Sequence, residues 1–189
     1  DQTYSLQPKP VDSPDTWDDT LHYQFPNLTI KKPVTLDFGA AGKGYLVDLV
    51  GVILQKHLIN SFCIDAGGDM YYHNTQTAPL SIGLEDPNDS KKIIGIATIY
   101  NQSICGSATH KRSWKGFHHI IQPHTVSSPQ EVVATWVIAQ ETIVADALAT
   151  CLFLVDPQVV ASAYSFEYCI MYNDRSIKKS LRFPVDLFT

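Results

Sequence analysis

The sequence has 189 residues, of which 44% are hydrophobic and 17% are charged, and its formal net charge is -5. The length suits one domain with a sizeable core, and the composition is typical of a water-soluble globular protein. The negative charge argues against a nucleic-acid partner, because phosphate binding needs clustered Lys and Arg side chains. No apolar run approaches the roughly 18 residues that a transmembrane helix needs, so no transmembrane segment is expected in this chain.

The N-terminal region divides into a lead-in and a first hairpin. Residues 1–20 hold three prolines among polar neighbours, which predicts an extended lead-in without a core of its own. Two short strands are expected next, at 21–25 and 28–30, around a Pro-Asn turn. We therefore expect residues 21–189 to form a single domain that follows this lead-in.

A glycine-rich loop is the most distinctive local feature. A short strand is predicted at 33–38, and the loop after it has Gly39, Gly42 and Gly44 around Lys43. Glycine allows positive φ and a close approach of other groups to the main chain. The start of the helix that follows favours an anion, because its first N–H groups are unpaired. The spacing matches neither the phosphate loop nor the dinucleotide fingerprint, so a tight turn with a solvated lysine remains the alternative.

The helix after this loop is expected to end near residue 59. Its apolar positions recur at helical spacing, so we expect the resulting stripe to cover a sheet. The residues at this spacing are Leu46, Leu49, Val50, Ile53, Leu54, His57 and Leu58.

The rest of the chain alternates strands with tight turns. Strands outnumber helices, which indicates an α+β fold with a mostly antiparallel sheet and packed helices. Strands are predicted at 61–65, 70–73, 80–84, 91–100, 118–121, 132–139, 168–172 and 177–183, and helices at 142–155 and 159–164.

Two polar residues interrupt the otherwise apolar helix at 142–155. Asp146 and Thr150 stand four residues apart, so their oxygens lie on one face of the helix. A buried, ionised Asp needs a partner or a metal, and carboxylate and hydroxyl oxygens suit magnesium. The alternative is that Asp146 pairs with a lysine while Thr150 bonds back to a helical carbonyl.

The histidines and one cysteine are further candidates for chemistry. His118 and His119 are adjacent in a predicted strand and so face opposite sides. One of them packs or points to solvent, and the other could act as a base, although a lone histidine in a strand is more often structural. A zinc site from His119 and His124 would lack a third ligand nearby. Cys105 could pair with His119 as a nucleophile, but no orienting Asn or Asp stands near it in the sequence.

Five stretches in a single order resemble the ApbE family, the flavin transferases that attach FMN to proteins. The family pattern runs D-x-G-G-I-A-K-G-Y-x-x-D, N-x-G-G-D, S-G, H-I-I-D-P-x-T-G and A-D-A-x-x-T. Five matches in order are far more specific than any one of them. The corresponding stretches of this chain are 37–48, 65–69, 105–106, 119–125 and 145–150.

The resemblance implies roles for the matching residues. Asp146 and Thr150, with a main-chain carbonyl near Gly42, would hold Mg²⁺ against the pyrophosphate of FAD. His119 would remove the proton from a Thr or Ser hydroxyl of an acceptor protein, whose oxygen attacks the FMN-side phosphorus while AMP leaves. The residues implied to bind FAD are Gly39, Lys43, Asp48, Gly67, Gly68 and Asp69.

The resemblance also bears on architecture and location. It implies a T-fold-related core and a cell-envelope or periplasmic location. Family members carry a longer N-terminal region that helps to close the flavin pocket, and we expect 21–189 to be one ApbE-like domain without it.

Four positions depart from the family pattern. Cys105 replaces Ser, Gln122 replaces Asp, Asp65 replaces Asn and Val126 replaces Gly. Loss of a carboxylate three residues from the expected base can change that base's orientation or pKa. The expected function is magnesium-dependent FMN transfer from FAD to a protein. An FAD pyrophosphatase and a flavin-binding module with a reduced site are the alternatives.

Overall fold

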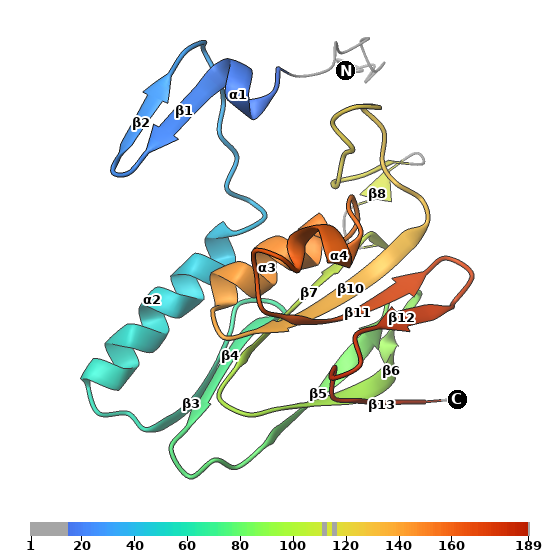
Figure 1. The fold of residues 1–189 in the computed structure, drawn as a ribbon. Coiled ribbons are helices and arrows are strands. Elements are labelled where there is room, and N and C mark those ends of the chain that lie inside the picture. The colour runs from blue at the N-terminus through green and yellow to red at the C-terminus, as the bar shows by residue number, and fades with distance from the viewer. Residues whose placement is uncertain (1–14, 111–112, 115–116, 189) are drawn as a thin grey trace, which may run out of the picture.

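The computed structural model describes residues 15–110, 113–114 and 117–188. Figure 1 shows helices against a large sheet and an N-terminal hairpin set apart from the rest of the fold. The helices are α1 (Trp17–Thr20), α2 (Gly42–Lys56), α3 (Thr142–Cys151) and α4 (Pro157–Val160). The strands are β1 (Leu21–Gln24), β2 (Asn27–Ile30), β3 (Ser61–Asp65), β4 (Asp69–Asn74), β5 (Leu80–Asp86), β6 (Asp89–Ile99), β7 (Ser103–Ala108), β8 (Ser113–Trp114), β9 (Phe117–His118), β10 (Val132–Ala139), β11 (Glu167–Tyr172), β12 (Ile177–Lys179) and β13 (Val185–Leu187).

Every strand pair in the described part of the chain is antiparallel. Six strands form the main sheet in the order β12-β11-β10-β7-β4-β3, and β13, β6 and β5 form a second sheet. Two-stranded ribbons are made by β1 with β2 and by β8 with β9. The predicted α+β class with a mostly antiparallel sheet is therefore confirmed.

Strand β10 is buried on both faces and separates two apolar clusters. Trp136 and Ile138 pack with residues of β5 and β6, such as Leu84 and Ile99, between the two sheets. Val137 points to the opposite face and packs in the cluster that holds α3. Alternate residues of a strand point to opposite faces, so a continuous apolar run fits a strand covered on both sides. The main sheet thus lies between the helices and the smaller sheet.

Helix α2 forms as predicted, but it turns the opposite face to the core. Gly44, Val47 and Gly51 are its buried residues, whereas most of the predicted apolar stripe is exposed. A Cβ at Gly44 would overlap the carbonyl of Thr142, and one at Gly51 would lie 2.8 Å from the ring of Tyr71. The two glycines let α2 approach α3 and the sheet closely. The expectation that the stripe covers a sheet is therefore wrong.

Several predicted strands are shorter than expected or missing. The segment 33–38 forms no strand, and of the predicted strand at 118–121 only His118 pairs, as the last residue of β9 against β8. Strand β7, which was not predicted, fills the centre of the main sheet between β10 and β4. Helix α3 ends at Cys151, and α4 begins at Pro157 rather than at 159, because the Asp156 side chain accepts from the Gln158 N–H and caps it.

The predicted lead-in is only partly described. Residues 1–14 lie outside the described residues. Residues 17–20 form a helical turn rather than extended chain, because Thr16 and Asp19 make a capping box at its start. In the described part of the chain, no helix has the length and apolar character to cross a bilayer.

Candidate active site

The loop that precedes α2 is a compact turn held by its own hydrogen bonds. The Gly39 N–H donates to the Asp37 carboxylate over 2.6 Å, and the Gly42 N–H donates to the Phe38 carbonyl over 2.7 Å. No positive φ is recorded in this loop. Its glycines therefore serve close approach, at Gly44 above all, rather than a left-handed turn.

Two buried carboxylates share one lysine at the start of α2. Lys43 forms an ion pair with Asp69, and its Nζ lies 3.4 Å from Oδ1 of Asp146. Both carboxylates are buried, while the Lys43 side chain is about half exposed. Two carboxylates beside one ammonium leave a negative charge in excess, which favours a further cation at this point.

Asp146 is also tied to the backbone of α2. Its Oδ2 accepts from the Gly44 N–H over 2.9 Å, within the first turn of α2. A carboxylate is stabilised there by the unpaired N–H groups and by the helix dipole. Asp146 is therefore fixed by one oxygen, and its other oxygen has only the distant contact with Lys43 among the hydrogen bonds of the described residues.

A reciprocal contact joins α3 to α2. The carboxylate of Asp48 accepts from the N–H groups of Thr142 and Ile143, over 2.8 and 2.9 Å. Asp48 thus caps the start of α3 from another helix, which satisfies two N–H groups that a helix leaves unpaired. With the bond between Gly44 and Asp146, it clamps the two helices together from both sides.

The clamp opens onto a groove of about 460 Å³, a size that suits a small-molecule ligand. The groove brings together six of the predicted site residues, which come from the loop before α2, the first turn of α2, the turn after β3, the segment after β9, and α3. They are Gly39, Lys43, Gly67, His119, Asp146 and Thr150.

Four predicted site residues do not line this groove. Gly42 is the first residue of α2, Asp48 caps α3, and Asp69 is buried beneath Lys43. Gly68 has a φ of +99°, which only glycine adopts readily, and it lines a neighbouring cavity. The roles assigned to all ten residues, inside and outside the groove, stay predictions.

The two histidines of the predicted pair occupy different environments. His118 is buried, its Nε2 lies 2.6 Å from the Pro129 carbonyl, and its Nδ1 accepts from the Ile120 N–H. Both of its ring nitrogens therefore bind backbone groups, which makes it a structural histidine. His119 is exposed and lines the groove. The expectation that one histidine of the pair packs is met by His118, and the role of His119 as a base stays a prediction.

The environment of Cys105 does not favour a nucleophilic thiolate. Its side chain is fully buried below α3, where Sγ lies 3.7 Å from the Thr142 carbonyl. Burial, followed by the nearby charge of Asp146, raises the pKa of the Cys105 thiol far above its usual range. A thiol in this state does not ionise near neutral pH, so it packs rather than reacts.

A zinc centre is likewise unsupported in the described residues. They contain no group of three or more His, Cys, Asp or Glu side chains that could hold a metal ion. A site built from one carboxylate, a hydroxyl and main-chain oxygens contains fewer than three such side chains, so this observation does not exclude it. Magnesium uses such sites, because it keeps water or phosphate oxygens as its remaining ligands.

Some groove residues were absent from the predicted site. Asp37 belongs to the glycine-loop motif, and its carboxylate lines the groove while it braces Gly39. Ser107 on β7 places its Oγ 3.2 Å from Oγ1 of Thr150. Ser107 follows the Cys-Gly stretch by one residue, but no strand was predicted there, so nothing in the sequence indicated that its side chain points toward α3. The other unpredicted lining residues are Ala40, Gly106, Ala108 and Ile120.

A second cavity of about 180 Å³ adjoins the groove. It shares Gly67 and three β7 residues with the groove and extends between the two sheets. Trp136 lines it, as do Glu85 and His110, whose Oε1 and Nε2 lie 3.3 Å apart. The groove and this cavity together thus extend from the carboxylate cluster to the space between the two sheets.

Comparison with known proteins assigns the fold to a family. A family model described as the ApbE family matches residues 5–167. The chain belongs to the ApbE family. The order of the five matching stretches is thereby explained by common descent.

Two curated ApbE relatives carry the name FAD:protein FMN transferase. The protein of Klebsiella pneumoniae is 32% identical over 124 residues, which cover 62% of this chain and 38% of that protein. The protein of Treponema pallidum is 28% identical over 135 residues, which cover 63% of this chain and 37% of that protein. The aligned region is thus well under half the length of these relatives.

A solved ApbE structure shares the fold. The ApbE protein of Thermotoga maritima matches with a TM-score of 0.76 at 24% identity, over 86% of this chain and 57% of that chain. The expected ApbE-like architecture is therefore confirmed. Polypeptide equal to about two-fifths of that structure has no counterpart here.

Proposed function

We propose that this chain carries the active site of a magnesium-dependent FAD:protein FMN transferase. The reaction moves FMN from FAD to a Thr or Ser hydroxyl of an acceptor protein and releases AMP. The observation that carries the proposal is that Lys43, His119, Asp146 and Thr150 line one groove, although they come from distant parts of the sequence. The names of the curated relatives support the same chemistry. The family resemblance implies an envelope or periplasmic setting.

The residues present fit a magnesium ion. Asp146 and Thr150 offer hard oxygen ligands in the groove, and the carboxylate pair with Lys43 has an excess negative charge. A carbonyl near Gly42 would complete the set of protein ligands. Bound there, magnesium supplies Lewis-acid neutralisation of the charge on a diphosphate.

The chain's own residues position the substrate and move one proton. Lys43 offers a charge to the diphosphate, and the bare backbone at Gly39 and Gly67 allows phosphate oxygens to approach. His119 accepts the proton of the acceptor hydroxyl, and the oxygen forms a bond to the FMN-side phosphorus. The bond between that phosphorus and the bridging oxygen breaks, and AMP leaves with the electron pair. Phosphoryl transfers of this kind depend mainly on positioning and charge neutralisation.

One assay tests the proposal. The chain is mixed with FAD, magnesium chloride and an acceptor protein, and the products are examined for AMP and for flavin fluorescence that survives a denaturing gel. Fluorescent acceptor with AMP is the expected result. AMP with free FMN would replace the proposal with a pyrophosphatase, and FAD binding without AMP would replace it with a binding module.

Substitutions sharpen the test. His119→Ala should lower the transfer rate by about 100-fold or more while FAD binding is kept, because a general base contributes on that order. Asp146→Ala should remove the response to magnesium. His57→Ala, an exposed histidine at the end of α2, is the matched control and should leave the rate unchanged. Normal turnover in His119→Ala would overturn the assignment of the base.

A further inference from the structure

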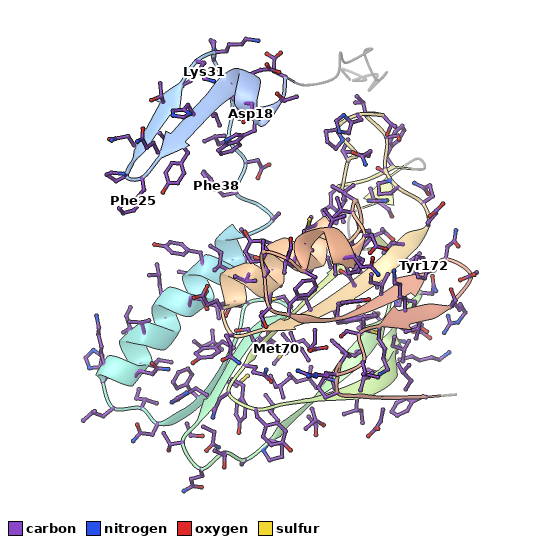
Figure 2. The ribbon with its side chains drawn as sticks, viewed as in Figure 1. Asp18, Phe25, Lys31, Phe38, Met70 and Tyr172 are labelled. Atoms are coloured by element: carbon purple, nitrogen blue, oxygen red, sulfur yellow. The ribbon has the colours of Figure 1, made fainter. Side chains whose placement is uncertain are left out.

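Strand β7 turns a row of small side chains toward α3. Ser103, Cys105 and Ser107 are alternate residues of this strand, so they point to the same face of the main sheet. Ile104 points the other way, into the apolar cluster between the two sheets, and its strand partner Met70 packs against that cluster (Figure 2). The three side chains therefore lie beneath α3, the helix that supplies the side-chain ligands of the proposed magnesium site.

Two of these residues are serines that pair with threonines of α3. Ser103 Oγ lies 2.8 Å from Oγ1 of Thr142, and both side chains are fully buried. Ser107 Oγ lies 3.2 Å from Oγ1 of Thr150, and both residues line the groove. The same kind of contact thus joins one strand to one helix twice, once in the interior and once at the candidate site.

The hydroxyl of Thr150 depends on this contact for its orientation. In the described part of the chain it hydrogen-bonds to Ser107 and to no other group. A bond back to a helical carbonyl was the alternative left open by the sequence, and the structure has the contact with Ser107 instead. A hydroxyl has one proton and two lone pairs, so a hydroxyl that binds a cation must direct its proton to a different acceptor. Ser107 Oγ is the acceptor within reach.

We propose that Ser107 is a positioning residue for Thr150 in the magnesium site. Thr150 donates its proton to Ser107 Oγ, and this bond keeps the lone pairs of Thr150 Oγ1 directed into the groove, where Asp146 also lies. Loss of a group that orients a metal ligand in this way typically lowers metal affinity by roughly 10- to 100-fold. The inference rests on the proposed function, because it takes Thr150 as a ligand of magnesium.

A purely structural role for Ser107 has different consequences. The contact of Ser107 with Thr150 is only partly buried, so water can replace a lost partner there. The contact of Ser103 with Thr142 is fully buried, so removal of the serine hydroxyl leaves an unsatisfied polar group and destabilises the fold. The two pairs therefore separate an effect on stability from an effect on metal binding.

The test measures metal binding by the chain in the absence of FAD and of an acceptor protein. Manganese(II) chloride is the probe, because Mn²⁺ accepts the same oxygen ligands as Mg²⁺ and its paramagnetic resonance signal reports the free ion. Ser107→Ala should raise the Kd for Mn²⁺ about tenfold or more, with little change in Tm. Ser103→Ala is the matched control, and it should lower Tm while the Kd for Mn²⁺ stays unchanged.

A second pair of variants separates the hydroxyl of residue 107 from the space that it fills. Threonine and valine have nearly the same shape, but only threonine has a hydroxyl that can accept the proton of Thr150. Ser107→Thr should therefore keep the affinity for Mn²⁺ close to that of the unaltered chain. Ser107→Val should lose as much affinity as Ser107→Ala.

Four outcomes would overturn the inference. Equal affinity for Mn²⁺ in the unaltered chain and in Ser107→Ala would do so while the metal site stands. Equal losses in Ser103→Ala and Ser107→Ala, or in Ser107→Thr and Ser107→Val, would show that the hydroxyl at 107 has no special part. Absence of Mn²⁺ binding by the unaltered chain would remove the metal site as well. By contrast, a chain that binds Mn²⁺ through Ser107 as expected but transfers no FMN would contradict the proposed function alone.

Discussion

Individual substitutions in this chain differ in how much they disturb the candidate site. Cys105 replaces the family's serine, but its side chain is buried under α3 and does not face the groove. The Ser107 hydroxyl is the one that lies beside Thr150. Gln122 replaces the family's aspartate, and its backbone pairs with Ser127 in an isolated bridge. The exchange at 105 therefore alters packing below the groove, whereas the exchange at 122 alters the loop that follows His119.

Val126 is a strained residue in that same loop. Its φ is +50°, a left-handed conformation that β-branched side chains rarely adopt, and the family has glycine at this position. We predict that Val126→Gly raises the free energy of unfolding by about 0.5–1 kcal/mol, because relief of strain exceeds the added entropy of the unfolded chain. Urea unfolding measures this change.

A second glycine substitution is the control for Val126. Val159→Gly in α4 should lower the free energy of unfolding by about 0.5–1 kcal/mol, because Val159 has helical geometry and glycine there only adds entropy to the unfolded chain. Equal destabilisation by the two substitutions would show that the φ of Val126 costs little.

Among the elements, α2 and α3 determine the geometry of the site. Their closest approach is at Gly44, which both allows the contact and donates to Asp146. We predict that Gly44→Ala lowers the free energy of unfolding by about 2 kcal/mol or more, because a Cβ would overlap the backbone of α3 and force the helices apart.

Gly42 is the matched control for this change. A Cβ there would come no closer than 3.9 Å to its nearest neighbour, the Cβ of Phe38, so Gly42→Ala should be tolerated. Thermal unfolding of both variants, with FAD affinity as a second measurement, separates packing from helix propensity. Similar losses for Gly42→Ala and Gly44→Ala would contradict the close-approach explanation.

Asp48 acts at the scale of the helix pair because it caps α3 from α2. Asp48→Ala should cost about 1–2 kcal/mol of stability, because two N–H groups of α3 lose their acceptor. It should also raise the magnesium concentration needed for half-maximal activity, since Asp146 lies one turn further along α3. Glu141→Ala is a suitable control: Glu141 is the N-cap residue by position, yet its side chain makes no capping bond. Equal effects of the two substitutions would refute the role of Asp48.

For the whole molecule, several carboxylates stabilise the fold near neutral pH and make its stability fall in acid. The backbone N–H of Asn88, then the charged Arg175, lower the pKa of Asp86 below its usual value. Hydrogen bonds likewise lower the pKa of the surface residues Asp156 and Asp174. A group with a lowered folded-state pKa stabilises the protein above its unfolded-state pKa of about 4, and this contribution is lost as the pH falls through the folded-state value.

The free energy of unfolding should therefore fall steadily from about pH 5 to about pH 3. Asp86→Asn should flatten this dependence. Arg175→Gln should flatten it less, because the bond from Asn88 remains. Denaturant unfolding at a series of pH values measures both slopes. An unchanged slope in Asp86→Asn would assign the acid sensitivity to other carboxylates.

The sequence by itself determined the family and many of the elements, although it missed β7 at the centre of the main sheet. Helix α2, strand β10 and the hairpin β1–β2 follow from periodicity and turn residues, which act between neighbours in the chain. The ordered motifs predicted the ApbE fold, and six of the ten predicted site residues line one groove.

Only the tertiary structure decided which face of each element is buried. The apolar stripe of α2 predicted burial, but Gly44 and Gly51 allow a closer contact with α3 and Tyr71, so the stripe faces outward. The capping of α3 by Asp48 joins residues more than ninety positions apart. Periodicity shows which residues share one face of an element. Which of the faces is buried depends on partners that are distant in the sequence, and these partners meet only when the chain folds.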